Sequence, residues 1–284
     1  MARIEVPACY SEAMTEGYQA LRQGAGWLDL DSRGRIVARG RDRARLLHNL
    51  TSNEVKKMVP GQSCYAFLLN PQGRIQADLH LLCLADHFLL DTDPGLREKV
   101  PQLIRRYIIA DQVELEDVSS ATASLGVEGP ASPQLSGDFT VAPFTVTGQP
   151  GYRIYCAPDA KAAIVAQLES QGVKAATEDD ARLVRIENGK PLYGEDIRDT
   201  NLPQETQQME AVSFTKGCYL GQEIVERIRA QGRVHRQLER IELEGAESPA
   251  PGTKLEIGGH EAEITSAIYS PHFGKTIALA YVRH

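Results

Sequence analysis

The chain has 284 residues, enough for about two domains, and its 42% hydrophobic and 24% charged residues are ordinary for a soluble globular protein with a full core. Its net charge is −7, from 31 basic and 38 acidic residues. That balance argues against a protein that binds nucleic acid by neutralising phosphates, and it leaves only a local basic patch open for such a role.

The cysteines and the apolar segments indicate the cellular compartment in which the protein is expected. The five cysteines are Cys9, Cys64, Cys83, Cys156 and Cys218. They form no C-x-x-C pair, which favours a reducing compartment over a disulfide framework or a zinc site. The first ten residues lack the apolar region of a signal peptide, and no apolar run approaches the length of a membrane span. We expect a cytoplasmic protein with no metal site, or an organellar one whose targeting segment is absent here.

Apolar periodicity and turn signals predict helices and strands along the whole chain. Helices are expected over residues 11–26, 42–50, 159–170 and 177–188. One more helix is expected after Asp93, which would cap it, with Pro94 at its first position and Pro101 as an internal kink. Strands are expected over residues 62–69, 75–84, 112–118 and 152–156. From Arg233 onward, short strands alternate with turns, which predicts a small all-β module.

Two charged features interrupt this pattern. Arginines recur at positions 33, 35, 39, 41, 43 and 45. We expect them on solvated faces of a strand and a helix, and the alternative is a cradle for the acidic tail of a ligand. Asp78 lies in the mostly apolar strand I-Q-A-D-L-H-L-L-C-L, so its carboxylate is either on an exposed face or half-buried.

The segment T-K-G-C-Y-L-G-Q-E-I-V-E-R, residues 215–227, combines a turn with the start of a helix. Cys218 lies just before the predicted helix N-terminus at Gly221, and Lys216 is two residues upstream. Both the helix end and the ammonium are positive, which favours a thiolate. The alternative is that Cys218 is a small buried hydrophobic residue, as most free cysteines are.

The octapeptide K-G-C-Y-L-G-Q-E, residues 216–223, resembles the signature of the YgfZ-type folate-binding proteins, which are relatives of the aminomethyltransferase (T-protein) of the glycine cleavage system. Residues 68–79, 185–197 and 264–282 are similar to T-protein segments, so the resemblance covers essentially the whole chain. The chain differs from T-proteins in carrying the motif cysteine, in having Ala77 where a second acid is common, and in being shorter.

The resemblance implies an α+β fold with a T-protein-like three-domain arrangement around a central funnel. The implied domains are residues 1–44 with 120–205, residues 45–119 with 206–235, and a small C-terminal β-barrel over residues 236–284. The first two are discontinuous α/β domains.

The resemblance also implies the site. Glu187 falls on the glutamate that grips the pterin, and Asp78 on the aspartate that contacts folate nitrogens or orients the attacking one. A carboxylate can accept two pterin hydrogens side by side. Tyr193 and Lys216 are further folate-binding candidates, and Cys218 and Asp78 are the catalytic candidates. The alternatives are a surface ion-pair role for Glu187 and a solvent-facing position for Asp78.

The favoured function is that of a tetrahydrofolate-binding accessory protein that supports iron–sulfur cluster assembly or repair in client enzymes, including tRNA-modifying enzymes. Its partners would be tetrahydrofolate or a one-carbon derivative and iron–sulfur enzymes or assembly proteins, with neither a membrane nor direct contact with nucleic acid. The first alternative is a folate-dependent aminomethyltransferase, which Asp78 favours. The altered 216–223 segment argues against turnover of an aminomethylated lipoyl carrier. The second alternative is a non-catalytic folate-binding module.

Overall fold

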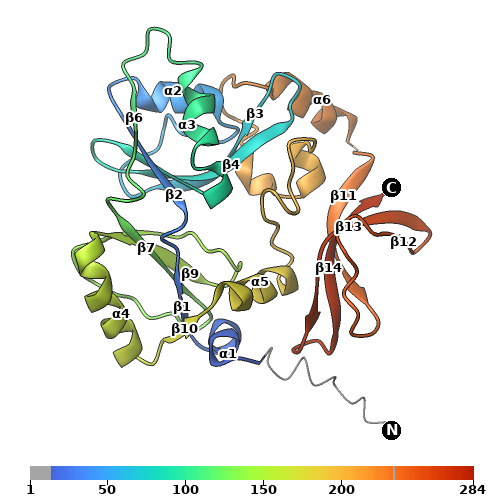
Figure 1. The fold of residues 1–284 in the computed structure, drawn as a ribbon. Coiled ribbons are helices and arrows are strands. Elements are labelled where there is room, and N and C mark those ends of the chain that lie inside the picture. The colour runs from blue at the N-terminus through green and yellow to red at the C-terminus, as the bar shows by residue number, and fades with distance from the viewer. Residues whose placement is uncertain (1–13, 233) are drawn as a thin grey trace.

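The computed structural model describes residues 14–232 and 234–284, in which helices and three β-sheets are combined (Figure 1). The expectations for Cys9, for the first ten residues and for the start of the first helix lie outside the described residues. The mixed α and β composition is confirmed, whereas the division into three domains at the stated boundaries stays a prediction.

The helices are α1 (Glu16–Gln23), α2 (Arg43–Leu50), α3 (Lys99–Arg105), α4 (Lys161–Ser170), α5 (Glu178–Glu187) and α6 (Gln222–Gln231). Short 3-10 turns are η2 (Pro94–Leu96), η3 (Pro158–Ala160), η4 (Pro203–Thr206) and η5 (Met209–Ala211). The strands are β1 (Gly26–Asp29), β2 (Gly34–Arg39), β3 (Ser63–Leu69), β4 (Ile75–Cys83), β5 (Phe88–Thr92), β6 (Glu114–Asp117), β7 (Ala123–Glu128), β8 (Thr140–Ala142), β9 (Gly151–Cys156), β10 (Lys174–Ala176), β11 (Arg236–Leu243), β12 (Lys254–Ile257), β13 (His260–Ser270) and β14 (Lys275–Arg283).

One sheet has the strand order β3-β4-β5-β2-β6, with antiparallel pairing throughout. Helices α2 and α3 pack on one of its faces, where Leu47 and Val100 join Ala77, Leu79 and Leu81 of β4 in a single apolar cluster. Successive residues of a strand point to opposite faces. The even-numbered residues of β4, Asp78 among them, therefore point away from this cluster.

A second sheet has the order β10-β1-β7-β9-β8. The β10–β1 pair is parallel and the others are antiparallel. Helix α4 buries Ile164 and Leu168 against it. Helices α1 and α5 pack together through Tyr18, Leu21 and Val184. In Figure 1 this sheet lies below the sheet that contains β2, β3, β4 and β6.

The C-terminal β module predicted from the sequence is confirmed as a four-stranded antiparallel sheet, β11-β14-β13-β12. Its main polar link to the remaining chain is Asp196, which accepts hydrogen bonds of 2.6 Å from both Thr265 and Ser266. Arg185 of α5 binds the other oxygen of Asp196 at 2.8 Å. The link is fully buried at Asp196, so it fixes the sheet against α5.

The helix predicted after Asp93 differs from the expectation. Asp93 makes no side-chain capping bond, and its carboxylate binds Arg33 at 2.8 Å instead. Pro101 lies in the first turn of α3, where its missing N–H would have no helical partner anyway. It is therefore the third residue of that helix and lies too near its start to act as the expected internal kink.

The expectation that all six arginines are solvated is wrong for Arg33 and Arg35, which are buried. They lie where the chain passes from β1 in one sheet to β2 in the other. Several backbone carbonyls converge there, and Arg35 donates to those of Leu30, Ser119 and Thr122. Arg41 and Arg45 are exposed as expected, whereas Arg39 and Arg43 are half-buried.

The 215–227 segment forms a turn followed by α6, as predicted, and it is held against the turn between β3 and β4. Gly221 has φ = 83°, which is strained for any residue with a side chain. A Cβ on Gly221 would lie 2.6 Å from the carbonyl oxygen of Asn70. Gly73 approaches Ile224 equally closely, at 2.8 Å for an added Cβ. The two turns therefore pack without room for side chains.

We expect Gly221→Ala to lower the free energy of unfolding by about 2–4 kcal/mol, because left-handed strain adds to a backbone clash. Gly232→Ala is the matched control: it ends the same helix at φ = 74°, with nothing within 4 Å of an added Cβ. It should cost only about 1 kcal/mol. Urea denaturation checks both variants, and equal losses would show that the contact between the turns does not contribute.

Candidate functional site

A cavity of about 340 Å³ lies between the polar faces of the two five-stranded sheets. Its polar lining comes from β3, β4, β9 and the loops around residues 145 and 190, and includes Cys64, Tyr65, Asp78, His80, Arg153 and Lys190. Exposed Glu210 also borders the cavity, whereas Arg153 is fully buried. The cavity therefore runs from solvent to a buried polar wall.

Asp78 presents an unused acceptor to this cavity. Its Oδ2 accepts a hydrogen bond of 2.8 Å from the hydroxyl of Tyr65, but its Oδ1 is buried and has no hydrogen-bond partner among the described residues. Burial, together with the nearby carboxylate of Asp93, raises the pKa of Asp78 to about 7. An acid with this pKa can hold or release a proton near neutral pH.

His80 lies on the same face of β4 and is enclosed by aromatic rings. Its imidazole is 4.8 Å from the ring of Tyr65 and 4.3 Å from that of Phe144. Burial, followed by the positive charges of Arg153 and Lys190, holds its pKa well below the ordinary value. His80 is therefore a neutral imidazole, and it cannot supply a charge to the cavity.

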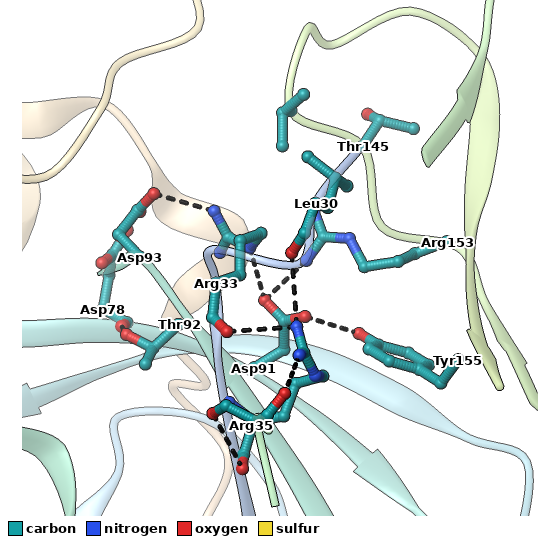
Figure 2. A network of polar contacts seen from close by, with 12 residues as sticks. Leu30, Arg33, Arg35, Asp78, Asp91, Thr92, Asp93, Thr145, Arg153 and Tyr155 are labelled. Carbon is teal, nitrogen blue, oxygen red and sulfur yellow. Dashed lines mark hydrogen bonds and ion pairs between the residues drawn. The ribbon is translucent and has the colours of Figure 1, made fainter. Parts of the chain in front are cut away.

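Behind the cavity, Asp91 of β5 is the centre of a buried ion-pair network (Figure 2). Its Oδ1 lies 2.7 Å from Arg33 Nε and 2.6 Å from Arg153 Nη1. Its Oδ2 accepts a hydrogen bond of 2.8 Å from the hydroxyl of Tyr155. Burial opposes ionisation, but the two guanidiniums outweigh it and hold the pKa of Asp91 far below its usual range. Asp91 is therefore a permanent anion that joins the two sheets.

Of the residues predicted from the sequence, Asp78 borders the cavity and Tyr193 lies behind it. Asp78 is buried, so the solvent-facing alternative is wrong, because the face of β4 opposite the helices is covered by the second sheet. The hydroxyl of Tyr193 donates to the carbonyl of Gln76 at 2.7 Å and accepts from Lys99 at 3.1 Å. Tyr193 thus anchors its loop, in which the two preceding residues, Pro191 and Leu192, line the cavity.

Glu187 lies apart from the cavity lining, at the end of α5. Its Oε1 accepts hydrogen bonds from Tyr18, at 2.8 Å, and from Ser270. Its Oε2 is buried without a hydrogen-bond partner in the described part of the chain, and the nearest cation is Arg22 at 3.5 Å. The surface role for Glu187 is wrong, because α1 and β13 enclose it.

Lys216 and Cys218 lie outside the cavity lining as well. The ammonium of Lys216 is buried and donates to the carbonyls of His48, Thr51 and Asn53, the last two at 2.6 and 2.9 Å. All three of its hydrogens are used, which makes Lys216 a structural clamp on the end of α2. Cys218 is exposed, so the buried-hydrophobe alternative is wrong.

Sequence reasoning missed Arg153, Lys190, His80 and Tyr65. Two signals were available. His80 follows Asp78 by two residues in a strand and so shares its face, and Arg153 is a charge inside the otherwise buried strand G-Y-R-I-Y-C.

Within residues 14–232 and 234–284, no three His, Cys, Asp or Glu side chains gather as possible metal ligands. In the same ranges, no helix is long and apolar enough to span a bilayer.

The fold and the cavity define a class: a mixed α/β protein with a buried carboxylate beside a cavity between two sheets. The family model described as the GCVT N-terminal domain matches residues 1–144. An aminomethyltransferase of Geobacillus kaustophilus is 30% identical, over 98% of this chain and 84% of that protein. An aminomethyltransferase of Rubrobacter xylanophilus is 27% identical, over 98% and 81%. The chain belongs to the aminomethyltransferase, or T-protein, family.

A solved structure supports the fold assignment. The glycine cleavage system aminomethyltransferase T from Bartonella henselae superposes with a TM-score of 0.84 at 21% identity, and the match covers 94% of this chain and 81% of that one. The predicted likeness to the T-protein fold is therefore confirmed, whereas the finer YgfZ-type assignment stays a prediction.

We expect the raised pKa of Asp78 to appear in the pH dependence of stability. Its folded-state pKa of about 7 exceeds the ordinary 3.8, so the protonated acid stabilises the fold at low pH, and this stabilisation is lost as the pH rises through that window. Asp78→Asn stays neutral. The free energy of unfolding of the variant minus that of the wild type should therefore rise by up to about 4 kcal/mol between about pH 4 and 8.

Urea denaturation across a pH series measures this gap between variant and wild type. The control is Asp86→Asn. A hydrogen bond from His87 and other contacts lower the pKa of exposed Asp86. The difference in free energy of unfolding between Asp86→Asn and the wild type should therefore change weakly with pH and in the opposite sense. A gap for Asp78→Asn that stays constant with pH would contradict the raised pKa.

Proposed function

We propose that this protein is a tetrahydrofolate-dependent transferase of the aminomethyl type, with tetrahydrofolate or a one-carbon derivative bound in the cavity beside Asp78. The observation that carries the proposal is the unpaired, buried Oδ1 of Asp78, in a cavity that opens to solvent. An unsatisfied buried acceptor is costly, and a ligand that donates a hydrogen bond to it removes that cost.

The chemistry of a reduced pterin fits this acceptor. Its ring and amino nitrogens carry several N–H donors, which a carboxylate oxygen can accept with charge assistance. The hydroxyl of Tyr65 holds the other oxygen at 2.8 Å and so fixes the direction of the free one. Bound tetrahydrofolate would supply a nitrogen that takes up the one-carbon unit.

The roles of the chain's own residues follow from their positions. Asp78 orients the ligand and, with a pKa of about 7, can hold a proton at Oδ1 or release it during transfer. Pro143, Phe144 and Val146 border the cavity opposite β4 and limit its water content. His80 stays neutral and completes the wall, so Asp78 is the acid–base group of the cavity.

The relatives named aminomethyltransferase support this function over the accessory role favoured from the sequence. The accessory protein for iron–sulfur enzymes remains the second candidate, because one observation favours it. Cys218 is exposed on a turn that Lys216 and Gly221 hold in place, where a partner protein can reach it.

We expect Asp78→Asn to weaken tetrahydrofolate binding by about 1–3 kcal/mol, because the amide group offers a poorer acceptor than the free carboxylate oxygen. Glu187→Gln tests the other carboxylate that the sequence indicated as a pterin contact, which lies apart from the cavity lining and has Arg22 3.5 Å from its Oε2. Calorimetric titration under anaerobic conditions measures both affinities.

The control for this titration is again Asp86→Asn, which makes the same chemical change on an exposed side chain. Full affinity in Asp78→Asn would remove Asp78 from the site. Full affinity in Glu187→Gln would limit Glu187 to its contacts with Tyr18 and Ser270.

For the activity, we expect the wild-type protein to release ammonia from an aminomethylated lipoyl carrier only when tetrahydrofolate is present. Asp78→Asn should reduce the rate by about 10²- to 10⁴-fold, the usual contribution of a positioned acid–base group. Cys218→Ala should keep the wild-type rate, because Cys218 does not border the cavity. Ammonia release in single-turnover assays measures all three.

No ammonia release by the wild type would contradict the transferase and promote the second candidate. In that case Cys218→Ala should fail to restore iron–sulfur enzyme activity in a deletion strain while it keeps its affinity for folate. Restoration by Cys218→Ala would leave the exposed thiol without a role in either function.

A further inference from the structure

The guanidinium of Arg153 has one edge that no group of the described chain uses. Arg153 in β9 is fully buried, and its Nη1 binds Asp91 Oδ1 at 2.6 Å. Its Nε and Nη2 are buried without hydrogen-bond partners in residues 14–232 and 234–284. These two atoms lie on the same edge of the guanidinium plane, which is an edge that can bind a carboxylate through two parallel hydrogen bonds.

This free edge is not needed for the ion-pair network. Asp91 already has Arg33 and Arg153 on one oxygen and Tyr155 on the other (Figure 2). Arg35 offers an internal comparison, since it is also fully buried. Its Nε, Nη1 and Nη2 all have acceptors, namely Thr122 Oγ1 and several backbone carbonyls. A buried arginine that serves only the fold thus has its donors satisfied here, and Arg153 does not.

A second cation borders the same part of the cavity. Lys190 lines it and donates to the carbonyl of Thr145, which leaves two of its three hydrogens available. It makes no ion pair with any described carboxylate within 4 Å. Burial, together with the guanidiniums of Arg153 and Arg33, lowers the pKa of Lys190 in spite of Glu128. An anion bound between Arg153 and Lys190 would offset the cost of burying these two positive charges next to each other.

We propose that the buried wall of the cavity is a carboxylate-binding subsite, in which the Nε–Nη2 edge of Arg153 grips a ligand carboxylate and Lys190 assists. This subsite goes beyond the folate proposal, because it does not require folate to be the other occupant. The free Oδ1 of Asp78 borders the same cavity. The ligand class is therefore a small carboxylate that also carries an N–H donor, such as an amino acid.

The carboxylate can come from a separate small molecule or from the glutamate tail of a folate. Burial favours the separate molecule, because Arg153 is fully enclosed whereas Glu210 marks the exposed side of the cavity. A long tail leaves through the open side, and a small carboxylate can be enclosed completely.

The test is titration of the full-length protein, without folate, with acetate, glycine and ethylamine, followed by calorimetry and by ligand-detected NMR. Acetate and glycine should bind and ethylamine should not, with glycine tighter than acetate because of Asp78. Arg153→Lys keeps a positive charge beside Asp91 but lacks the two-donor edge, so it should lose at least tenfold in affinity for both carboxylates.

Tyr155→Phe is the matched control, because it removes a partner of Asp91 without touching the free edge of Arg153. It should lower the thermal midpoint while leaving carboxylate affinity within about twofold. If Arg153→Lys does not fold, Lys190→Met replaces it. Lys190 is outside the Asp91 network, and this change should weaken carboxylate binding about threefold to tenfold.

The source of the carboxylate is decided by comparing folate with pteroate, which lacks the glutamate. An Arg153-dependent preference for folate would assign the subsite to the tail, and equal binding would assign it to a separate molecule. The proposal is overturned if neither acetate nor glycine binds and no Arg153-dependent preference for folate over pteroate is found. This holds even if tetrahydrofolate itself binds. Equal losses in Arg153→Lys and Tyr155→Phe overturn it too.

Discussion

A buried carboxylate, that of Asp91, joins the two larger sheets. It lies in β5 of one sheet, and Arg153 and Tyr155 reach it from β9 of the other, while Arg33 comes from the segment that joins β1 to β2. Removing one partner of a buried pair leaves an uncompensated charge, which typically costs about 3–5 kcal/mol. The sheets are therefore joined by these polar contacts and by an apolar cluster in which Leu82 and Leu89 meet Phe144, and the cavity lies beside the polar contacts.

Asp78 and Asp91 show how neighbouring strands give two carboxylates opposite properties. Asp91 pairs with His80, two residues from Asp78, in the β4–β5 ladder. Asp91 has two guanidiniums within 3 Å and stays charged, whereas Asp78 has one tyrosine hydroxyl, the carboxylate of Asp93 nearby and a pKa of about 7. The environment thus keeps one acid ionised and raises the pKa of the other towards neutrality, which suits Asp78 to its proposed role.

Much of this could be read from the sequence where the signal is local. The turn at residues 70–73 between two strands, the helix that begins after Gly221 and the C-terminal β module depend on turn residues and periodicity, and Asp78 stood out as a charge in an apolar strand. Arg153 reaches Asp91 across 62 residues, and Lys216 reaches Thr51 across 165. Such pairings depend on how sheets and loops pack, which no local pattern reports.

The positions of two thiols, those of Cys64 and Cys218, separate the two candidate functions in space. Cys64 lines the cavity, but burial raises its pKa to about 12 although Lys216 opposes this, so it is a protonated, unreactive thiol at neutral pH. In the proposed reaction, proton transfer inside the cavity is therefore assigned to Asp78 and not to Cys64. The exposed thiol of Cys218 lies elsewhere, on the turn that Lys216 clamps to α2. Because the two sites share no side chain, a folate-dependent reaction in the cavity and a thiol-dependent contact at the surface are physically compatible in one molecule.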